Sequence, residues 1–180
     1  MPVPASEPTA STLMPATMLS AAPLELQPLP PPATRAPTNP FAGPYVGFKV
    51  GGNWSDGRGA QPSPEHFTVF PGLLAGYGFD LGGVVLGAEL FADFHHGSST
   101  FKDAGLDAKL GVPFDNVMPY ARIGITGTWP DVRPHGGVGV EFMLAPRVSL
   151  AAEWTMDRTN AGGTRRTNNS VTLGLNYRFY

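Results

Sequence analysis

The feature of this sequence that most limits its fold is an alternation of apolar residues with polar or small ones from about residue 41 onward. In "SVTLGLNYRFY" the odd positions from 171 to 179 are apolar or aromatic, and the even positions carry Thr, Gly, Asn and Arg. A period of two is typical of a β-strand with one apolar face. Such runs occupy about 45–54, 67–79, 84–96, 103–112, 118–129, 136–145, 147–157 and 169–180. The sequence therefore predicts an all-β fold of eight strands.

Composition excludes several other classes of protein. Glycine, 23 of 180 residues, recurs throughout the alternating region and disfavours helices there. Uninterrupted apolar runs never approach the roughly 18 residues that a transmembrane helix needs. The absence of cysteine excludes disulfides, thiolate metal sites and a cysteine nucleophile. With a net charge of −2 there is no basic surface for nucleic acid, and we expect neither a nucleic-acid partner nor a cofactor.

Residues 1–42 differ in composition from the rest of the chain. Proline stands in nearly every short window, charges are few, and glycine does not occur before residue 43. Proline removes backbone donors and biases its neighbours toward extended conformations. We therefore predict a disordered segment over 1–42, with polyproline II character at "PLPPP", and a separate β-domain over 43–180.

Two all-β architectures fit the alternation. A soluble sandwich or barrel places apolar side chains inside, whereas a transmembrane barrel turns them toward lipid and keeps a polar lumen. The polar faces here carry mostly Gly, Ala, Ser and Thr with single charges, which suits the crowded interior of an eight-stranded barrel. The runs of about ten residues also match tilted strands that cross a bilayer. These observations favour an eight-stranded, antiparallel, up-and-down transmembrane β-barrel.

The connections between the runs alternate in length. "SDGRGAQPSPEH" and "RTNAGGTRRTNN" are long, whereas "DLGG", "PFDN" and "AP" are short. Bacterial outer-membrane barrels have long loops outside and tight turns in the periplasm. The pattern thus predicts that both termini are periplasmic.

Aromatic residues lie near both ends of the predicted strands. Such residues prefer the two membrane interfaces, where they form girdles. The predicted girdles contain Trp54, Trp129 and Trp154 on the outer side and Phe79, Tyr177 and Phe179 on the inner side.

Several segments together resemble a known family. They are "GPYVGFKVGGNW", "GLLAGYGFDLGGVVLGAEL", "MPYARIGITG" and the final "LGLNYRF". Over about 43–180 the chain resembles the small outer-membrane β-barrels of Gram-negative bacteria, which include the OmpA transmembrane domain and the opacity-type porins. The resemblance implies the barrel fold and an outer-membrane location. It does not imply cell-wall anchoring, because no peptidoglycan-binding domain follows the last strand in this sequence.

Charged residues fall on the lumen side when the strands are phased by their apolar faces. Buried charges need partners, so we predict a lumen ion-pair network. It comprises Lys49, Glu89, Asp93, Asp107, Lys109, Arg122, Glu141, Glu153 and Arg178, and the same phasing turns Asp103, Arg147 and Asp157 inward. Such a network either fills a structural interior or lines a narrow, gated path for ions or small solutes.

The histidines His66, His95, His96 and His135 fall at or near the expected outer loops. A surface zinc site with a nearby aspartate is one interpretation, and scattered loop histidines without a metal are the other, which we prefer. The stretch "DFHHGSST" also suggests a lipid A-modifying enzyme with a His–Ser pair, an alternative with little support because its spacing matches no deacylase pattern. We therefore predict a non-catalytic barrel without a metal.

The expected partners are those of an outer-membrane surface protein. The expected loops 55–66 and 158–168 are candidates for contacts with host or envelope proteins, and Arg158, Arg165 and Arg166 for contacts with lipopolysaccharide phosphates. Thr172, Gly174, Tyr177 and Phe179 resemble the C-terminal signal that the barrel assembly machinery recognises. We expect a monomer.

Overall fold

The computed structural model describes residues 39–60, 63–95, 103–128, 131–161 and 163–180. All of them belong to one compact unit, Thr34–Tyr180. The strands of this unit are β1 (Gly43–Gly59), β2 (Ser63–Asp80), β3 (Val85–Asp93), β4 (Asp103–Gly111), β5 (Val117–Thr128), β6 (Asp131–Ala145), β7 (Val148–Ala161) and β8 (Thr164–Arg178). Among the described residues no helix is long and apolar enough to cross a membrane.

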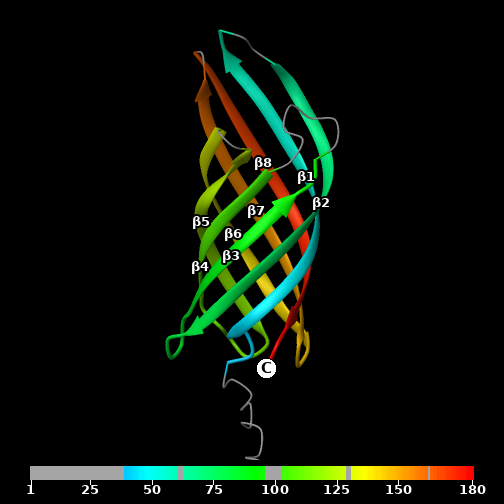
Figure 1. Cartoon of the computed structure of the whole chain (residues 1–180), viewed down its shortest axis with the longest axis vertical. Coiled ribbons are helices and arrows are strands. Elements are labelled where there is room, and N and C mark those ends of the chain that lie inside the picture. Colours follow the sequence, from blue (N-terminus) through cyan, green and yellow to red (C-terminus); the bar gives the residue numbers. More distant parts are fainter. Residues whose placement is uncertain (1–38, 61–62, 96–102, 129–130, 162) are drawn as a thin grey trace, which may run out of the picture. The chain divides into compact units, whose positions relative to one another are not determined.

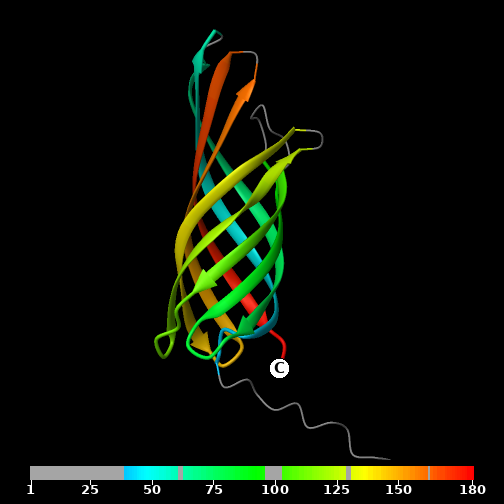
Figure 2. The same ribbon diagram turned by 90° about the vertical axis from the view of Figure 1, so that its left-hand side faces the viewer.

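The strands form a closed antiparallel barrel (Figures 1 and 2). Each strand pairs with the next along the chain, and β1 pairs with β8 to close the ring. The predicted eight-stranded, antiparallel, up-and-down barrel is therefore confirmed. We call the end that carries Gly43 and Tyr180 the terminal rim, and the opposite end the far rim.

The two faces of the barrel wall have opposite chemistry. Large apolar side chains, such as Ile123 and Leu90, are 70 % and 61 % exposed on the outer face. Charged side chains, such as Glu141 and Arg178, are 0 % and 1 % exposed inside. This inversion of a soluble protein's pattern is what a barrel surrounded by lipid requires.

Several strands are longer than the sequence predicted. The segments 55–66 and 158–168 were expected to be loops, but most of their residues continue β1, β2, β7 and β8. The pairing of β1 with β8 runs on as far as Gly59↔Thr164. Ladder hydrogen bonds hold these residues in strands although the apolar alternation has ended, and the alternation was the only signal used to place strand ends. Both hairpins extend beyond the others at the far rim (Figure 1).

The connections at the terminal rim are tight. Between β2 and β3, Gly82 and Gly83 have φ of 78° and 110°, which glycine adopts without strain. The side chain of Asp80 accepts a hydrogen bond of 3.0 Å from the Gly82 N–H, and the Leu81 N–H donates to the Val84 carbonyl at 2.9 Å. The sequence "DLGG" thus fixes a short turn, as its composition indicated.

Residues before β1 pack against the terminal rim. Residues 39–42 were expected to belong to the disordered Pro-rich segment, whereas the structure buries Phe41 to 1 % exposure. Phe41 forms an apolar cluster with Val85, Met118 and Tyr120. Its carbonyl oxygen accepts a hydrogen bond of 2.6 Å from Arg178 Nη1. The lumen is therefore covered at this end by an ordered segment.

Candidate functional site

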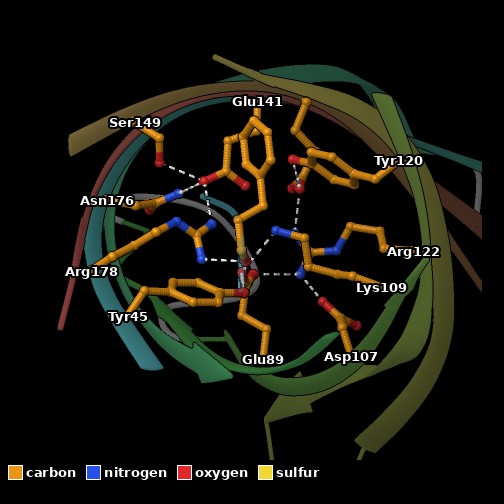
Figure 3. A network of polar contacts seen from close by, with 12 residues as sticks. Tyr45, Glu89, Asp107, Lys109, Tyr120, Arg122, Glu141, Ser149, Asn176 and Arg178 are labelled. Carbon is orange, nitrogen blue, oxygen red and sulfur yellow. Dashed lines mark hydrogen bonds and ion pairs between the residues drawn. The ribbon is translucent and has the colours of Figure 1, made fainter. Parts of the chain in front are cut away.

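The centre of the lumen is organised around Arg122 on β5 (Figure 3). Its Nη1 lies 2.5 Å from a carboxylate oxygen of Glu153 on β7, and its Nη2 lies 3.2 Å from one of Glu89 on β3. The guanidinium also pairs with Asp107 on β4. Since Arg122 is 4 % exposed, these three carboxylates balance a cation that is shielded from bulk water.

Two tyrosines and a lysine extend this centre. The Tyr45 and Tyr120 hydroxyls donate hydrogen bonds of 2.8 Å to Glu89 and 2.9 Å to Glu153. Lys109 Nζ lies 3.1 Å from Glu89 and 4.3 Å from the centre of the Tyr120 ring, a cation–π geometry. The Tyr45 ring lies over Gly76 on β2, and the Tyr120 ring lies over Gly139 on β6, each directly opposite in the strand pairing. A side chain at either glycine would collide with the ring.

A second cluster lies nearer the terminal rim, around Glu141. One of its carboxylate oxygens accepts hydrogen bonds of 2.6 Å from Arg178, 2.5 Å from Ser149 and 3.2 Å from Asn176. Arg178 also lies 4.7 Å above the Tyr45 ring, which links this cluster to the centre. The charge of Glu141 is therefore compensated by one cation and two neutral donors.

A third group of ion pairs lies toward the far rim. Lys49 Nζ is 3.0 Å from Asp93. Arg133 bridges Asp103 at 3.0 Å and Asp157 at 3.1 Å. Arg133 was not among the predicted residues, because "PDVRPH" reads as a loop although β6 already begins at Asp131.

Two of the histidines project into the lumen: His95 lies just after β3, at the end of the predicted run 84–96, whereas His135, which was expected in a loop, lies on β6. His95 is 6 % exposed and stacks at 4.2 Å on the ring of Phe70. His135 is 8 % exposed and its Nε2 contacts Asp107. His66 is exposed on β2, and His96 lies outside the described residues. No group of three or more possible metal ligands occurs in the part of the chain that the structure describes.

Two cavities inside the barrel are small. A cavity of about 30 Å³ lies between Lys49, Asp93 and His135, and another of about 10 Å³ lies beside Lys109 and Glu153. Volumes of this size hold about one water molecule each. Among the described residues, the middle of the lumen is thus filled by side chains.

All nine residues predicted for the network are buried in the lumen. Lys49, Glu89, Asp93, Asp107, Lys109, Arg122, Glu141, Glu153 and Arg178 are each 9 % exposed or less. Of the three further inward predictions, Asp103 and Asp157 face Arg133, whereas Arg147 does not face the lumen. Arg147 is exposed in the turn before β7 and donates a hydrogen bond to the Tyr180 carbonyl. Its predicted inward position was wrong because β7 begins one residue later than expected.

The network also uses residues that the sequence analysis did not name as members. Tyr45 and Tyr120 stand at the same inward phase as Lys49 and Arg122, so the period of two could have identified them. Asn176 is likewise in phase with Arg178. All three are uncharged, whereas the predicted network comprised charged residues only.

The residues predicted for the aromatic girdles face outward where the structure describes them. Trp54, Trp154, Phe79, Tyr177 and Phe179 are between 39 % and 51 % exposed, and Trp129 lies outside the described residues. Trp54 packs against Phe67 with ring centres 5.0 Å apart. On β1 the next outward residue beyond Trp54 is the charged Asp56, so the apolar band of this strand ends there.

Comparison with known proteins identifies one family. The family model described as "Outer membrane protein beta-barrel domain" matches residues 11–179. No curated protein sequence matches the chain.

Solved structures resemble the barrel. Neisserial surface protein A has 16 % identity and a TM-score of 0.51, over 74 % of this chain and 97 % of that one. The attachment invasion locus protein Ail of Yersinia pestis has 11 % identity and a TM-score of 0.43, over 75 % and 99 %. The outer membrane enzyme PagL has 12 % identity and a TM-score of 0.43, over 72 % and 99 %. At such identities the likeness to Neisserial surface protein A shows the fold alone.

Proposed function

Since the chain belongs to the outer membrane protein β-barrel domain family, we propose that it is a non-catalytic barrel of the bacterial outer membrane with a structural or surface-interaction role. The observation that carries this proposal is the filled lumen. Arg122 and Glu141 each engage partners from several strands, and the cavities between them hold about one water molecule each. A lumen packed in this way stabilises a barrel and leaves its outer surface and far rim for contacts.

The absence of conductance is the first expected result. In planar lipid bilayers the purified full chain should give no steady single-channel current, because the ion pairs of Arg122 close the centre of the lumen. An established porin incorporated under the same conditions serves as the control for membrane insertion. A steady current, altered by Arg122→Ala, would contradict the sealed lumen and favour the alternative of a narrow pore.

The alternative of a catalyst acting on lipid A has little support in the described residues. His95, from the stretch that suggested this activity, points into the lumen and stacks on Phe70, whereas a catalyst for lipid A needs groups at the lipid face. Asp107 contacts His135 and not His95. The serines of that stretch, at 98 and 99, lie outside the described residues. A changed acylation pattern of lipid A in cells that express the chain would contradict the non-catalytic assignment.

We further propose that the terminal rim faces the periplasm and the far rim faces outward. The short turns at the terminal rim and the extended hairpins at the far rim support this orientation, by analogy with bacterial barrels. Both termini are then periplasmic. The proposed surface partners, host or envelope proteins, would meet the barrel at the far rim.

Cysteine labelling tests the orientation with little background, because the chain contains no native cysteine. A membrane-impermeant maleimide added to intact cells should modify Glu65→Cys on β2 near the far rim. Leu81→Cys, in the exposed turn at the terminal rim, should react only after the cells are opened. The reverse pattern would show that the barrel is inserted the other way.

The C-terminal strand is proposed to carry the assembly signal. Tyr177 and Phe179 are half-exposed on the outer face, and Thr172 and Gly174 face the lumen. The Phe179 N–H donates a hydrogen bond of 3.0 Å to the Pro44 carbonyl, so this strand also completes the ring. The described residues have no unpaired strand edge, which supports a monomer.

A further inference from the structure

A polar hollow on the outer face lies beyond the apolar band, over β8 and its neighbours β7 and β1. Its volume is about 500 Å³. The β8 residues at its floor are Thr167 and Asn169, which are smaller than the side chains on either side. We call this hollow the β8 groove.

The strand register arranges the groove in three rows. The row nearest the apolar band is Met156–Asn169–Trp54, the next is Arg158–Thr167–Asp56, and the last is Asn160–Arg165–Arg58. Each row reads from β7 across β8 to β1. Because alternate residues of a strand share a face, the three rows lie on the same outward face as the apolar residues of these strands.

The last row places two arginines directly opposite each other. Arg58 and Arg165 are cross-strand partners, and like charges in this position destabilise a sheet. Arg58 is partly compensated by Asp56, with Nε 3.1 Å from the carboxylate. Arg158 and Arg165 are exposed and take part in no ion pair among the described residues. An anion bound beside Arg165 would offset its repulsion from Arg58.

Carboxylates restrict where such an anion can lie. Asp56 and Glu65 also line the groove, both on the side of β1 and β2. Their charge repels a phosphate from that side, while Arg158 and Arg165 attract it to the side of β7 and β8. The groove is therefore asymmetric, with its free positive charge over β7 and β8.

The position of the groove along the strands indicates the kind of anion. A strand tilted by about 45° advances roughly 2.3 Å per residue along the barrel axis. Arg58 lies four residues beyond Trp54, so its backbone stands roughly 9 Å past the aromatic end of the apolar band. Trp54 and Met156, at the membrane side of the groove, offer apolar contact. The ligand expected at this height is an amphiphile with a phosphorylated headgroup.

We propose that the β8 groove binds a phosphate group of lipopolysaccharide in the outer leaflet, with Arg158 and Arg165 as the principal ligands. This inference depends on the proposed orientation, which places the far rim outside. It differs from the sequence-based expectation in one member, because Arg166 leaves the site. Arg166 alternates with Arg165 on β8 and therefore projects from the opposite face of the hairpin.

Lipopolysaccharide binding by matched variants tests the proposal. The probe is purified lipopolysaccharide, titrated against the detergent-solubilised full chain, with inorganic phosphate and dephosphorylated lipopolysaccharide in parallel. The variant that combines Arg158→Ala with Arg165→Ala should bind the intact lipid at least about tenfold more weakly, because charge-assisted hydrogen bonds are lost. Arg166→Ala, the control on the opposite face, should stay within about twofold of the original chain.

Each other outcome overturns the proposal. Equal losses in the double variant and in Arg166→Ala would show nonspecific attraction to positive charge. Unchanged affinity for the dephosphorylated lipid would exclude the phosphate as the recognised group. Inorganic phosphate that competes as well as the lipid would show a simple anion site. All the variants should keep the folded, heat-modifiable gel band, and a failure of binding leaves the conductance result intact, so the two proposals fail separately.

Discussion

Replacing Arg122 by alanine is expected to lower the free energy of unfolding by about 3–5 kcal/mol. The substitution leaves Glu89, Asp107 and Glu153 buried without the cation that all three share. Lys109 remains beside Glu89 but does not pair with Glu153 in the structure. Urea titration in lipid vesicles, followed by the gel shift between folded and unfolded forms, would measure the change.

An exposed pair on the same barrel provides the control. Arg58 also pairs with a carboxylate, at 3.1 Å, but its side chain is 87 % exposed. Exposed ion pairs contribute about 0–1 kcal/mol, so Arg58→Ala should hardly move the titration. Equal effects of the two substitutions would mean that water reaches Arg122, which would contradict a sealed lumen.

The second large effect is expected at the outer face. Leu173 on β8 is 52 % exposed between Val171 and Leu175, and its replacement by arginine should destabilise the barrel by about 2–4 kcal/mol in a bilayer. In a soluble protein an exposed leucine tolerates arginine, so the penalty arises only if lipid surrounds this residue. Urea titration in vesicles again measures it.

Thr167→Arg is the matched control for Leu173→Arg. Thr167 lies on the same strand and the same face, six residues farther toward the far rim, beyond the row of Trp54. An arginine near the interface should cost about 0–1 kcal/mol. If Leu173→Arg were as mild as Thr167→Arg, the apolar band would not be in contact with lipid.

The sequence predicted the lumen well because one periodicity governs every strand. Arg122 and Glu89 stand at inward positions of strands whose other face is apolar, so the sequence of each strand alone predicts that these side chains face the lumen. The partners in each ion pair could not be predicted, because they depend on the register between neighbouring strands. Lys49, for example, pairs with Asp93 and not with a glutamate.

The ends of the strands were harder to predict for a physical reason. Beyond the apolar band no face of the sheet is forced to be apolar, so alternation disappears although the backbone ladder continues. Gly59 and Thr164 are paired in a stretch that reads as a loop. An error of the same origin placed His135 in a loop. Arg147 was placed in a strand for the opposite reason, because the alternation begins one residue before β7 does.

The hydrogen bond between Phe179 and Pro44 brings the first and last strands together at one rim. The order of the strands around the ring is therefore cyclic, and the break between β8 and β1 is only one of the places where such a ring can be opened. A short peptide joining residue 180 to residue 43, with new ends cut into the turn between β4 and β5, would leave every strand pair in place. A segment fused to either terminus of the barrel domain emerges at the terminal rim, and a segment inserted between β1 and β2 emerges at the far rim.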